Sequence, residues 1–295
     1  MRTTSRTALL AASLLLGAGT ASAQNIFELA DSTNRFNVLT TALEATGLDQ
    51  AVKDANTTLT VFAPTDFAFF QTFGQAGVNN LLLPQNLPIL EQVLLYHVVP
   101  GALTSTDVVA TDQLTTLLDQ RIDIEVGSGM VSVDDAMLQY VDLFATNGVV
   151  HVLDGVLMPN LETIAGTAEA VGGFDTLLAA LGATGLDAAL EQPGPFTVFA
   201  PTDSAFGSLP AGLVDRLLLD VNLPILSDIL QYHVVPGRLY AEDVIAAGTL
   251  TTLNGLTLTV TVQGTDVFIN DSRVELADVE TVNGNIHVID AVLVP

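Results

Sequence analysis

The chain has 295 residues, 49% of them hydrophobic, and its 33 acidic and 8 basic residues give a formal net charge of −25 at pH 7. This composition is that of a globular protein and excludes a disordered one. The negative charge argues against nucleic acid and anionic membrane surfaces as partners, because like charges repel. Cysteine is absent, so disulfides are excluded and the core must supply the stability.

Residues 1–23 have the pattern of an export signal. Arg2 and Arg6 make the start basic, residues 8–19 are mostly Ala and Leu, and residues 21–23 read Ala-Ser-Ala, a small-residue cleavage site. The apolar run is shorter than the roughly 20 residues that span a bilayer. We therefore expect an exported protein, periplasmic or extracellular, whose mature chain has no membrane span.

The mature chain opens with a predicted helix that ends at Gly47. Ser32 or Thr33 is expected to cap its start, and one apolar face is formed by Phe36, Leu39 and Leu43. The alternation in residues 58–62 then predicts a half-buried strand. Thr65 is expected to cap the next helix, with Asp66 in its first turn facing the positive end of the helix dipole. Capping accounts for Asp66, so we expect no catalytic role for it.

Residues 86–101 read NLPILEQVLLYHVVPG and recur at 222–237 as NLPILSDILQYHVVPG, with twelve of sixteen positions identical. Each copy predicts a short buried helix that leads into a strand and ends at a Pro-Gly turn. Other segments recur with offsets of 136 to 138 residues. A period this long, seen twice, indicates tandem domains and not a solenoid. We expect residues 24–159 to form the first domain and residues 160–295 the second, joined by a linker of a few residues.

The periodicity changes to two after each Tyr-His segment. In the first domain this predicts strands at residues 121–126, 129–133 and 149–152. In the second domain it predicts strands at residues 256–262, 267–269 and 285–289. We expect these strands to form a small antiparallel system in each domain.

Three blocks that occur twice in the same order carry a family resemblance. In the first domain they are TLTVFAPTDFAFF, NLPILEQVLLYHVVPG and ATNGVVHVLDGVLMP, and the second domain has counterparts of all three. The chain resembles the fasciclin (FAS1) family over nearly all of residues 24–295. The resemblance implies an α+β fold of two tandem domains, each a wedge of two small β-sheets with several packed helices. It also implies a secreted, non-enzymatic protein of cell adhesion or extracellular matrix.

The residues point away from an enzyme independently. No G-x-S-x-G elbow, phosphate-binding glycine loop or H-E-x-x-H helix is present. The chain's histidines all belong to the repeat, at positions 97, 151, 233 and 287. His97 and His151 with a carboxylate could form a metal site, but neither pair has ligand spacing, and a buried histidine bonded to backbone is commoner. We expect no cofactor and no metal.

The resemblance implies two candidate partner-binding segments in each domain, the Tyr-His block and an Asp-Ile-type motif. The corresponding residues are Tyr96, His97, Asp142 and Leu143 in the first domain, and Tyr232, His233, Asp278 and Val279 in the second. Leu143 and Val279 replace the family's Ile, and Phe144 and Glu280 follow them. Both tyrosines stand among Leu and Val, so core packing with a satisfied hydroxyl is the expected alternative to direct contact.

Three functions remain open at this point. The first is an exported adhesion or matrix protein that binds a cell-surface protein or a polysaccharide. The second is a carrier of a small apolar ligand, a carotenoid or lipid, because the resemblance extends to algal proteins that bind carotenoids and the chain is rich in Leu and Val. The third is a cation-binding protein that uses the acidic residues and histidines.

Overall fold

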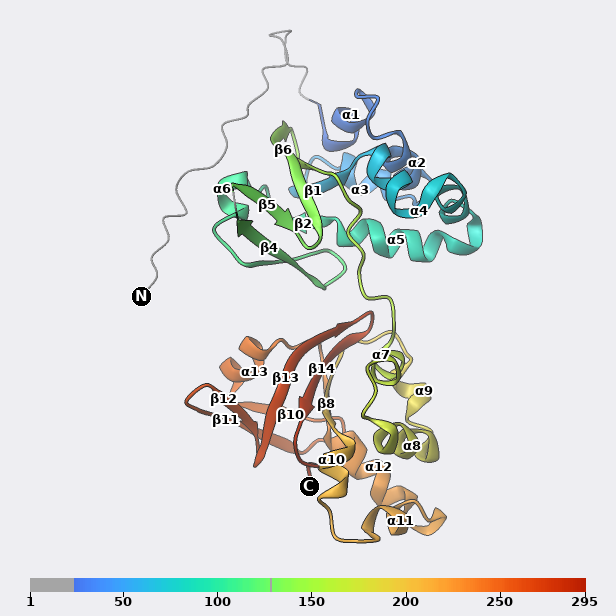
Figure 1. The fold of residues 1–295 in the computed structure, drawn as a ribbon, viewed down its shortest axis with the longest axis vertical. Coiled ribbons are helices and arrows are strands. Elements are labelled where there is room, and N and C mark those ends of the chain that lie inside the picture. The colour runs from blue at the N-terminus through green and yellow to red at the C-terminus, as the bar shows by residue number, and fades with distance from the viewer. Residues whose placement is uncertain (1–23, 128) are drawn as a thin grey trace. The chain divides into compact units, whose positions relative to one another are not determined.

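The computed structural model describes residues 24–127 and 129–295, so the expected export signal at residues 1–23 lies outside the described part. The chain divides between Pro159 and Asn160 into two compact units, the first and second domains (Figure 1). No helix among the described residues has the length and apolar character needed to cross a bilayer.

The helices and strands follow one another in the same order in the two domains. The helices of the first domain are α1 (Ile26–Asp31), α2 (Asn37–Thr46), α3 (Asp49–Lys53), α4 (Asp66–Leu81), the 3-10 helix η1 (Pro84–Asn86), α5 (Leu87–Tyr96) and α6 (Ser105–Val108). Its strands are β1 (Leu59–Pro64), β2 (Val98–Pro100), β3 (Gln113–Thr115), β4 (Arg121–Gly127), β5 (Met130–Val133), β6 (Ala136–Ala145) and β7 (Gly148–Leu153).

The second domain differs mainly in splitting the long fourth helix. Its helices are α7 (Ile164–Val171), α8 (Asp175–Thr184), α9 (Asp187–Leu190), α10 (Asp203–Gly207), α11 (Leu213–Leu217), η2 (Asp220–Asn222), α12 (Leu223–Tyr232) and α13 (Ala241–Ala247). Its strands are β8 (Phe196–Pro201), β9 (Val234–Pro236), β10 (Thr249–Thr251), β11 (Thr257–Gln263), β12 (Asp266–Ile269), β13 (Ser272–Thr281) and β14 (Gly284–Ile289).

The expected α+β class is confirmed, and each domain joins its strands in one seven-stranded order. That order is β2-β1-β7-β6-β5-β4-β3 in the first domain, and β9-β8-β14-β13-β12-β11-β10 repeats it in the second. The pairs β1 with β7 and β8 with β14 are parallel, and the remaining pairs are antiparallel. The antiparallel system expected for the strands after each Tyr-His segment is confirmed, while the strand predicted at residues 58–62 joins it through a parallel pair that the alternation did not predict. Alternation shows which face a residue occupies but not which strand lies beside it.

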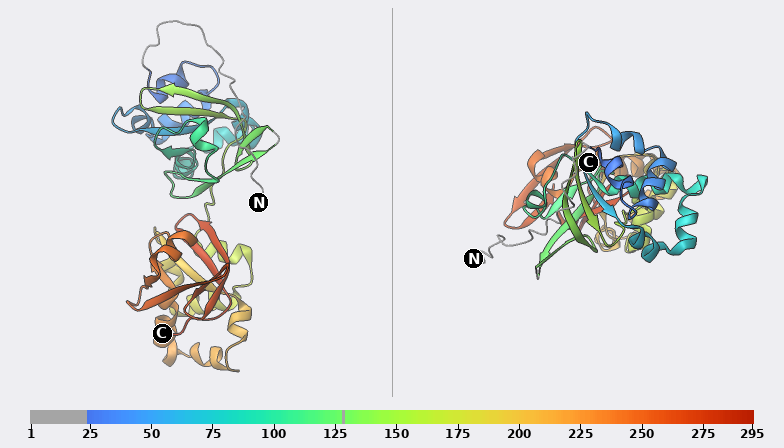
Figure 2. Two further views of the ribbon diagram at one scale, coloured as in Figure 1. Left: turned by 90° about the vertical axis from the view of Figure 1, so that its left-hand side faces the viewer. Right: turned by 90° about the horizontal axis from the view of Figure 1, so that it is seen from above.

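Each sheet packs a hydrophobic core on both faces. Val61 and Ala63 of β1 pack with helices α1 to α5, whereas Phe62 faces a second core that includes Val108 of α6. Figure 1 shows helices α1 to α5 gathered beside one face of the sheet and α6 on the other side of it, and Figure 2 shows the fold from two further directions. Every residue of β1 and β7 is buried, as befits strands covered on both sides.

The ends of α2 show one correct and one wrong prediction. Gly47 is its C-cap in the left-handed conformation, with φ 77°, as expected. Neither Ser32 nor Thr33 caps its start: the N-cap residue is Phe36, and Ser32 instead terminates α1, a helix that the sequence pattern did not reveal. Instead Asp66 accepts hydrogen bonds from the Val38 backbone N–H and the Asn37 side chain, both at 2.8 Å.

The predicted cap at Thr65 is confirmed. Its hydroxyl accepts a hydrogen bond from the Ala68 N–H at 3.2 Å, and Thr202 repeats this with Ala205 at 3.3 Å. Asp203 accepts bonds from the backbone of α8, mainly from Thr176 at 2.8 Å, and this hydrogen bond lowers the pKa of its carboxyl. The acidic residue after each cap thus joins two helices, a stabilising role that needs no chemistry from it.

A testable consequence concerns Gly148, where β7 begins beside β1. A Cβ at this position would lie 1.8 Å from the Leu59 carbonyl oxygen, so Gly148→Ala must displace the central parallel pair. We expect it to destabilise the first domain by at least about 2 kcal/mol, measured as a lower urea midpoint by circular dichroism. Gly127→Ala is the matched control, since a Cβ there meets no atom within 4 Å. Equal midpoints for the two variants would contradict the close approach.

Candidate functional site

The Tyr-His pair lies inside the first domain, at the point where α5 gives way to β2. Tyr96 is the last residue of the helix and His97 is its C-cap. The two side chains are 6% and 1% exposed. The predicted helix that leads into a strand is confirmed, with α5 ending at Tyr96 and β2 beginning at Val98.

His97 joins the helix to the end of the domain. Its Nδ1 lies 2.7 Å from the Val93 carbonyl oxygen, and its Nε2 accepts a hydrogen bond from the Leu157 backbone N–H at 2.9 Å. A carbonyl can only accept, so Nδ1 carries the proton and the ring is neutral. Burial lowers the pKa of His97 from 6.5 to about 4, partly opposed by the Val93 hydrogen bond.

The second domain repeats this arrangement. Nδ1 of His233 donates to the Ile229 carbonyl at 2.8 Å, and Nε2 accepts from the Leu293 N–H at 2.9 Å. Burial again lowers the pKa of the imidazole to about 4. Both rings use each nitrogen for a backbone contact, so neither offers a nitrogen to an external partner while the domain is folded.

The two tyrosine hydroxyls connect the same helix to the β-hairpins. The Tyr96 hydroxyl lies 2.9 Å from the Arg121 carbonyl oxygen and 3.0 Å from the Asp134 carboxylate. The Tyr232 hydroxyl donates to the Thr257 carbonyl at 3.0 Å and accepts from the Asn270 amide at 3.0 Å. Each ring is packed in the apolar core that lies on the same face of the sheet as α6 or α13.

Asp142 is placed by an irregularity in β6. The register of the β6–β7 pair shifts between Leu138 and Leu143, and Asp142 takes a left-handed conformation with φ 60°. Its carboxylate accepts the Ser105 backbone N–H at 2.7 Å and the Ser105 hydroxyl at 2.5 Å, at the start of α6. Asp278 repeats the conformation, with φ 59°, and accepts the Ala241 N–H at 2.7 Å.

A second buried histidine stands behind each of these carboxylates. Nδ1 of His151 accepts the Asp142 backbone N–H at 3.3 Å, while Nε2 donates to the Leu103 carbonyl at 3.0 Å. Burial lowers the pKa of His151, and the Asp142 charge opposes that shift. His287 makes the equivalent contacts with Asp278 at 3.3 Å and Leu239 at 3.0 Å, and burial lowers its pKa also.

The two residues that follow Asp142, and the two that follow Asp278, differ in exposure. Leu143 and Val279 are partly buried and pack against the helix-side cores. Phe144 is 68% exposed. Its counterpart Glu280 accepts a hydrogen bond from the Tyr240 hydroxyl at 2.8 Å instead. Phe144 is therefore more exposed than Asp142 and Leu143, which precede it.

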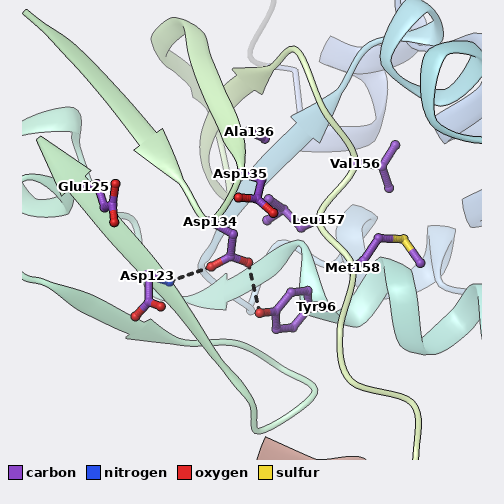
Figure 3. A pocket seen from close by; sticks show the side chains of 9 residues that line it. All are labelled: Tyr96, Asp123, Glu125, Asp134, Asp135, Ala136, Val156, Leu157 and Met158. Atoms are coloured by element: carbon purple, nitrogen blue, oxygen red, sulfur yellow. Dashed lines mark hydrogen bonds between the residues drawn. The ribbon is translucent and has the colours of Figure 1, made fainter. Parts of the chain in front are cut away.

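An acidic pocket of about 440 Å³ lies beside Tyr96 (Figure 3). Four carboxylates line it, those of Asp123, Glu125, Asp134 and Asp135. The rest of the lining comes from Ala136 and from the segment that follows β7, with Val156, Leu157 and Met158. The corresponding positions for Asp123, Glu125 and Asp134 hold Thr259, Thr261 and Asn270 in the second domain. Comparing acidic positions between the repeats would have drawn attention to this difference, but not to the pocket.

The described residues do not contain a close group of three or more His, Asp or Glu side chains suited to a metal ion. An apolar cavity inside the first domain, between α1, α2 and the central strands, has a volume of about 20 Å³. A cavity of that size holds about one water molecule, which is far too small for a carotenoid or lipid.

Comparison with known proteins identifies the family. The Fasciclin domain model matches residues 34–159 and again 172–295. The chain therefore belongs to the fasciclin domain family and contains two such domains in tandem.

Relatives occur in animals and bacteria. The chain is 34% identical over 240 residues to transforming growth factor-beta-induced protein ig-h3 of Sus scrofa, which covers 80% of this chain and 34% of the relative. It is 50% identical over 122 residues to protein sll1483 of Synechocystis sp., covering 41% of this chain and 67% of that protein. The chain thus spans about a third of the pig protein's length and about two thirds of the bacterial one's.

One solved structure, a FAS1 domain pair from the insect cell adhesion molecule fasciclin I, is also similar. It is 22% identical, with a TM-score of 0.43, and the match covers 88% of this chain and 97% of the insect one.

The buried imidazoles predict a dependence of stability on pH. An unfolded histidine takes up a proton near pH 6.5, whereas His97 and His233 resist protonation until about pH 4 when folded. The unfolded chain then binds more protons, so the free energy of unfolding falls as the pH drops from 6.5 towards 4. Urea unfolding at several pH values should show this fall.

The double variant His97→Phe and His233→Phe isolates that contribution. It should be less stable at pH 7, because two buried backbone N–H groups lose their acceptor at about 1–3 kcal/mol each. Its stability should also vary less than that of the parent between pH 6.5 and 4. A pH dependence identical to the parent's would show that these histidines are not the groups responsible.

Proposed function

We propose that this is an exported, non-enzymatic adhesion protein that contacts a cell-surface protein or a polysaccharide. Membership of the fasciclin family and the export pattern at residues 1–23 support this function. The histidines are consistent with it, because in both domains their ring nitrogens are engaged with backbone groups, which leaves no histidine nitrogen free to act as a base.

The observation that carries the proposal is the exposed Phe144 beside the Asp142 motif. Phe144 presents most of its ring to solvent, while the preceding backbone is fixed by the bonds from Asp142 to Ser105 and His151. A rigid, exposed aromatic residue loses little conformational entropy on binding, and such residues dominate the energetics of many interfaces. We propose Asp142, Leu143 and Phe144 as the contact segment of the first domain.

In the second domain we propose the corresponding segment, Asp278, Val279 and Glu280. Its contact would be more polar, because Glu280 replaces the phenyl ring and is already bonded to Tyr240. The buried Tyr96, His97, Tyr232 and His233 would then act on binding indirectly, by fixing the helices and hairpins behind these segments. The net charge of −25 favours a neutral or basic partner surface.

The test is the variant Phe144→Glu, which places in the first domain the residue found in the second. Purified mature protein should bind the cell surface of the source organism about tenfold or more weakly after this change. Retention on washed cells, titrated with protein concentration, measures the effect.

Met130→Glu is the matched control, because Met130 is also apolar and 52% exposed but lies on β5. It adds the same charge away from the proposed segment and should leave binding near that of the parent. Equal losses for both variants would attribute the effect to charge alone, and unchanged binding of Phe144→Glu would exclude this segment.

A further inference from the structure

The same turn is built with different side chains in the two domains. Asp134, between β5 and β6, and Asn270, between β12 and β13, are both left-handed, with φ 48° and 53°. Oδ1 of Asp134 accepts the Asp123 backbone N–H at 2.7 Å, and Oδ1 of Asn270 accepts the Thr259 N–H at 2.9 Å. An asparagine therefore fulfils the structural role, and the charge of Asp134 is not needed to form the turn.

The other terminal atom of each side chain, Oδ2 of Asp134 or Nδ2 of Asn270, lies within hydrogen-bond distance of a tyrosine hydroxyl. In the second domain Asn270 Nδ2 donates to Tyr232, which donates onward to the Thr257 carbonyl. In this chain the single Tyr232 hydroxyl proton has one acceptor, and the hydroxyl oxygen has one donor.

The first domain has one proton too few for the same chain when Asp134 is ionised. The single hydroxyl proton of Tyr96 faces two acceptors, the Arg121 carbonyl at 2.9 Å and Asp134 Oδ2 at 3.0 Å. A protonated Asp134 would donate from Oδ2 to the tyrosine oxygen, and Tyr96 would donate to Arg121. One added proton reproduces the pattern of the second domain.

The surroundings of Asp134 also favour its neutral form. Burial raises the pKa of this carboxyl, and the charges of Asp123 and Asp135 raise it further, against the opposing hydrogen bonds from Asp123 and Tyr96. Glu125 adds a fourth carboxylate to the pocket, and none of the described residues that line it is basic (Figure 3).

We propose that Asp134 is a proton-binding switch of the first domain. As the pH falls, its carboxyl takes up a proton, completes the chain from Asp134 through Tyr96 to the Arg121 carbonyl, and removes one of the four negative charges of the acidic pocket. Asn270 is its permanently neutral counterpart, so the second domain does not respond in this way. The charge that the pocket presents is then set by the pH of the solution around the protein.

The sign of the effect on stability follows from the raised pKa. A folded state that holds the proton more tightly than the unfolded state is favoured at low pH. This advantage is lost as the pH rises from the ordinary aspartate value of 3.8 through the higher value of the folded domain. The contribution of Asp134 therefore runs opposite to that of the histidines, and a variant is needed to separate the two.

The experiment compares mature full-length protein with its Asp134→Asn variant between pH 4 and 7. The variant has the side chain that the same turn carries in the second domain, so we expect it to fold. Relative to it, the parent should lose stability as the pH rises, by up to about tenfold in the folding equilibrium constant per pH unit within the titration range. In parent protein labelled with carbon-13 at aspartate carboxyls, the signal missing from the variant should titrate above 3.8.

Two further variants separate the hydrogen-bonded chain from a general charge effect. Asn270→Asp should give the second domain the same pH response. Asp135→Asn removes a charge from the pocket and leaves the Asp134–Tyr96 contact, so the shifted titration of Asp134 should persist. The switch is refuted if the stability difference between parent and Asp134→Asn is independent of pH, or if the assigned carboxyl titrates at or below 3.8.

Discussion

Each domain depends on a buried, uncharged imidazole that joins three parts of the chain. His97 stands where α5 ends and β2 begins, and its two nitrogens hold the helix carbonyl of Val93 and the N–H of Leu157 beyond β7. Segments 60 residues apart in sequence are thereby fixed to one ring. Placing a polar ring in the core is tolerable only because both nitrogens are satisfied and the ring stays neutral. The Tyr-His pair is thus explained by the architecture before any partner is considered.

Features determined by neighbouring residues could be predicted from the sequence. The end of α2 at Gly47, the Thr65 cap and the passage from α5 into β2 are of this kind, since each needs only a few consecutive residues. The duplicated segments of the sequence also predicted two FAS1-type domains, and the family match confirms them. The parallel pairing of β1 with β7 and the capping of α2 by Asp66 were not predictable, because both join residues that are distant in sequence.

In the candidate site, too, the sequence predicted local features but not the contacts between residues that are distant in sequence. The sequence indicated the Tyr-His and Asp motifs, and the expected burial of Tyr96 agrees with its 6% exposure. It did not indicate that Asp142 would bond to Ser105, or that Asp134 would reach the Tyr96 hydroxyl, since these contacts depend on how the hairpins return to the helices. The acidic pocket forms only because the hairpins fold back to the helix that carries Tyr96.

The two copies act as internal references for each other. Where both keep a residue, as with His97 and His233, the contacts coincide and the role is structural. Where the two copies differ, as with Phe144 and Glu280, the same strand pairing holds side chains of different chemistry.

The central claim, that four neutral imidazoles are fixed in defined tautomers, is tested directly by long-range proton–nitrogen NMR of the mature protein. We expect His97 and His233 to carry their proton on Nδ1 and His151 and His287 on Nε2, with His97 and His233 uncharged down to about pH 4. Rapidly exchanging tautomers, or titration of these rings near pH 6.5, would contradict the account.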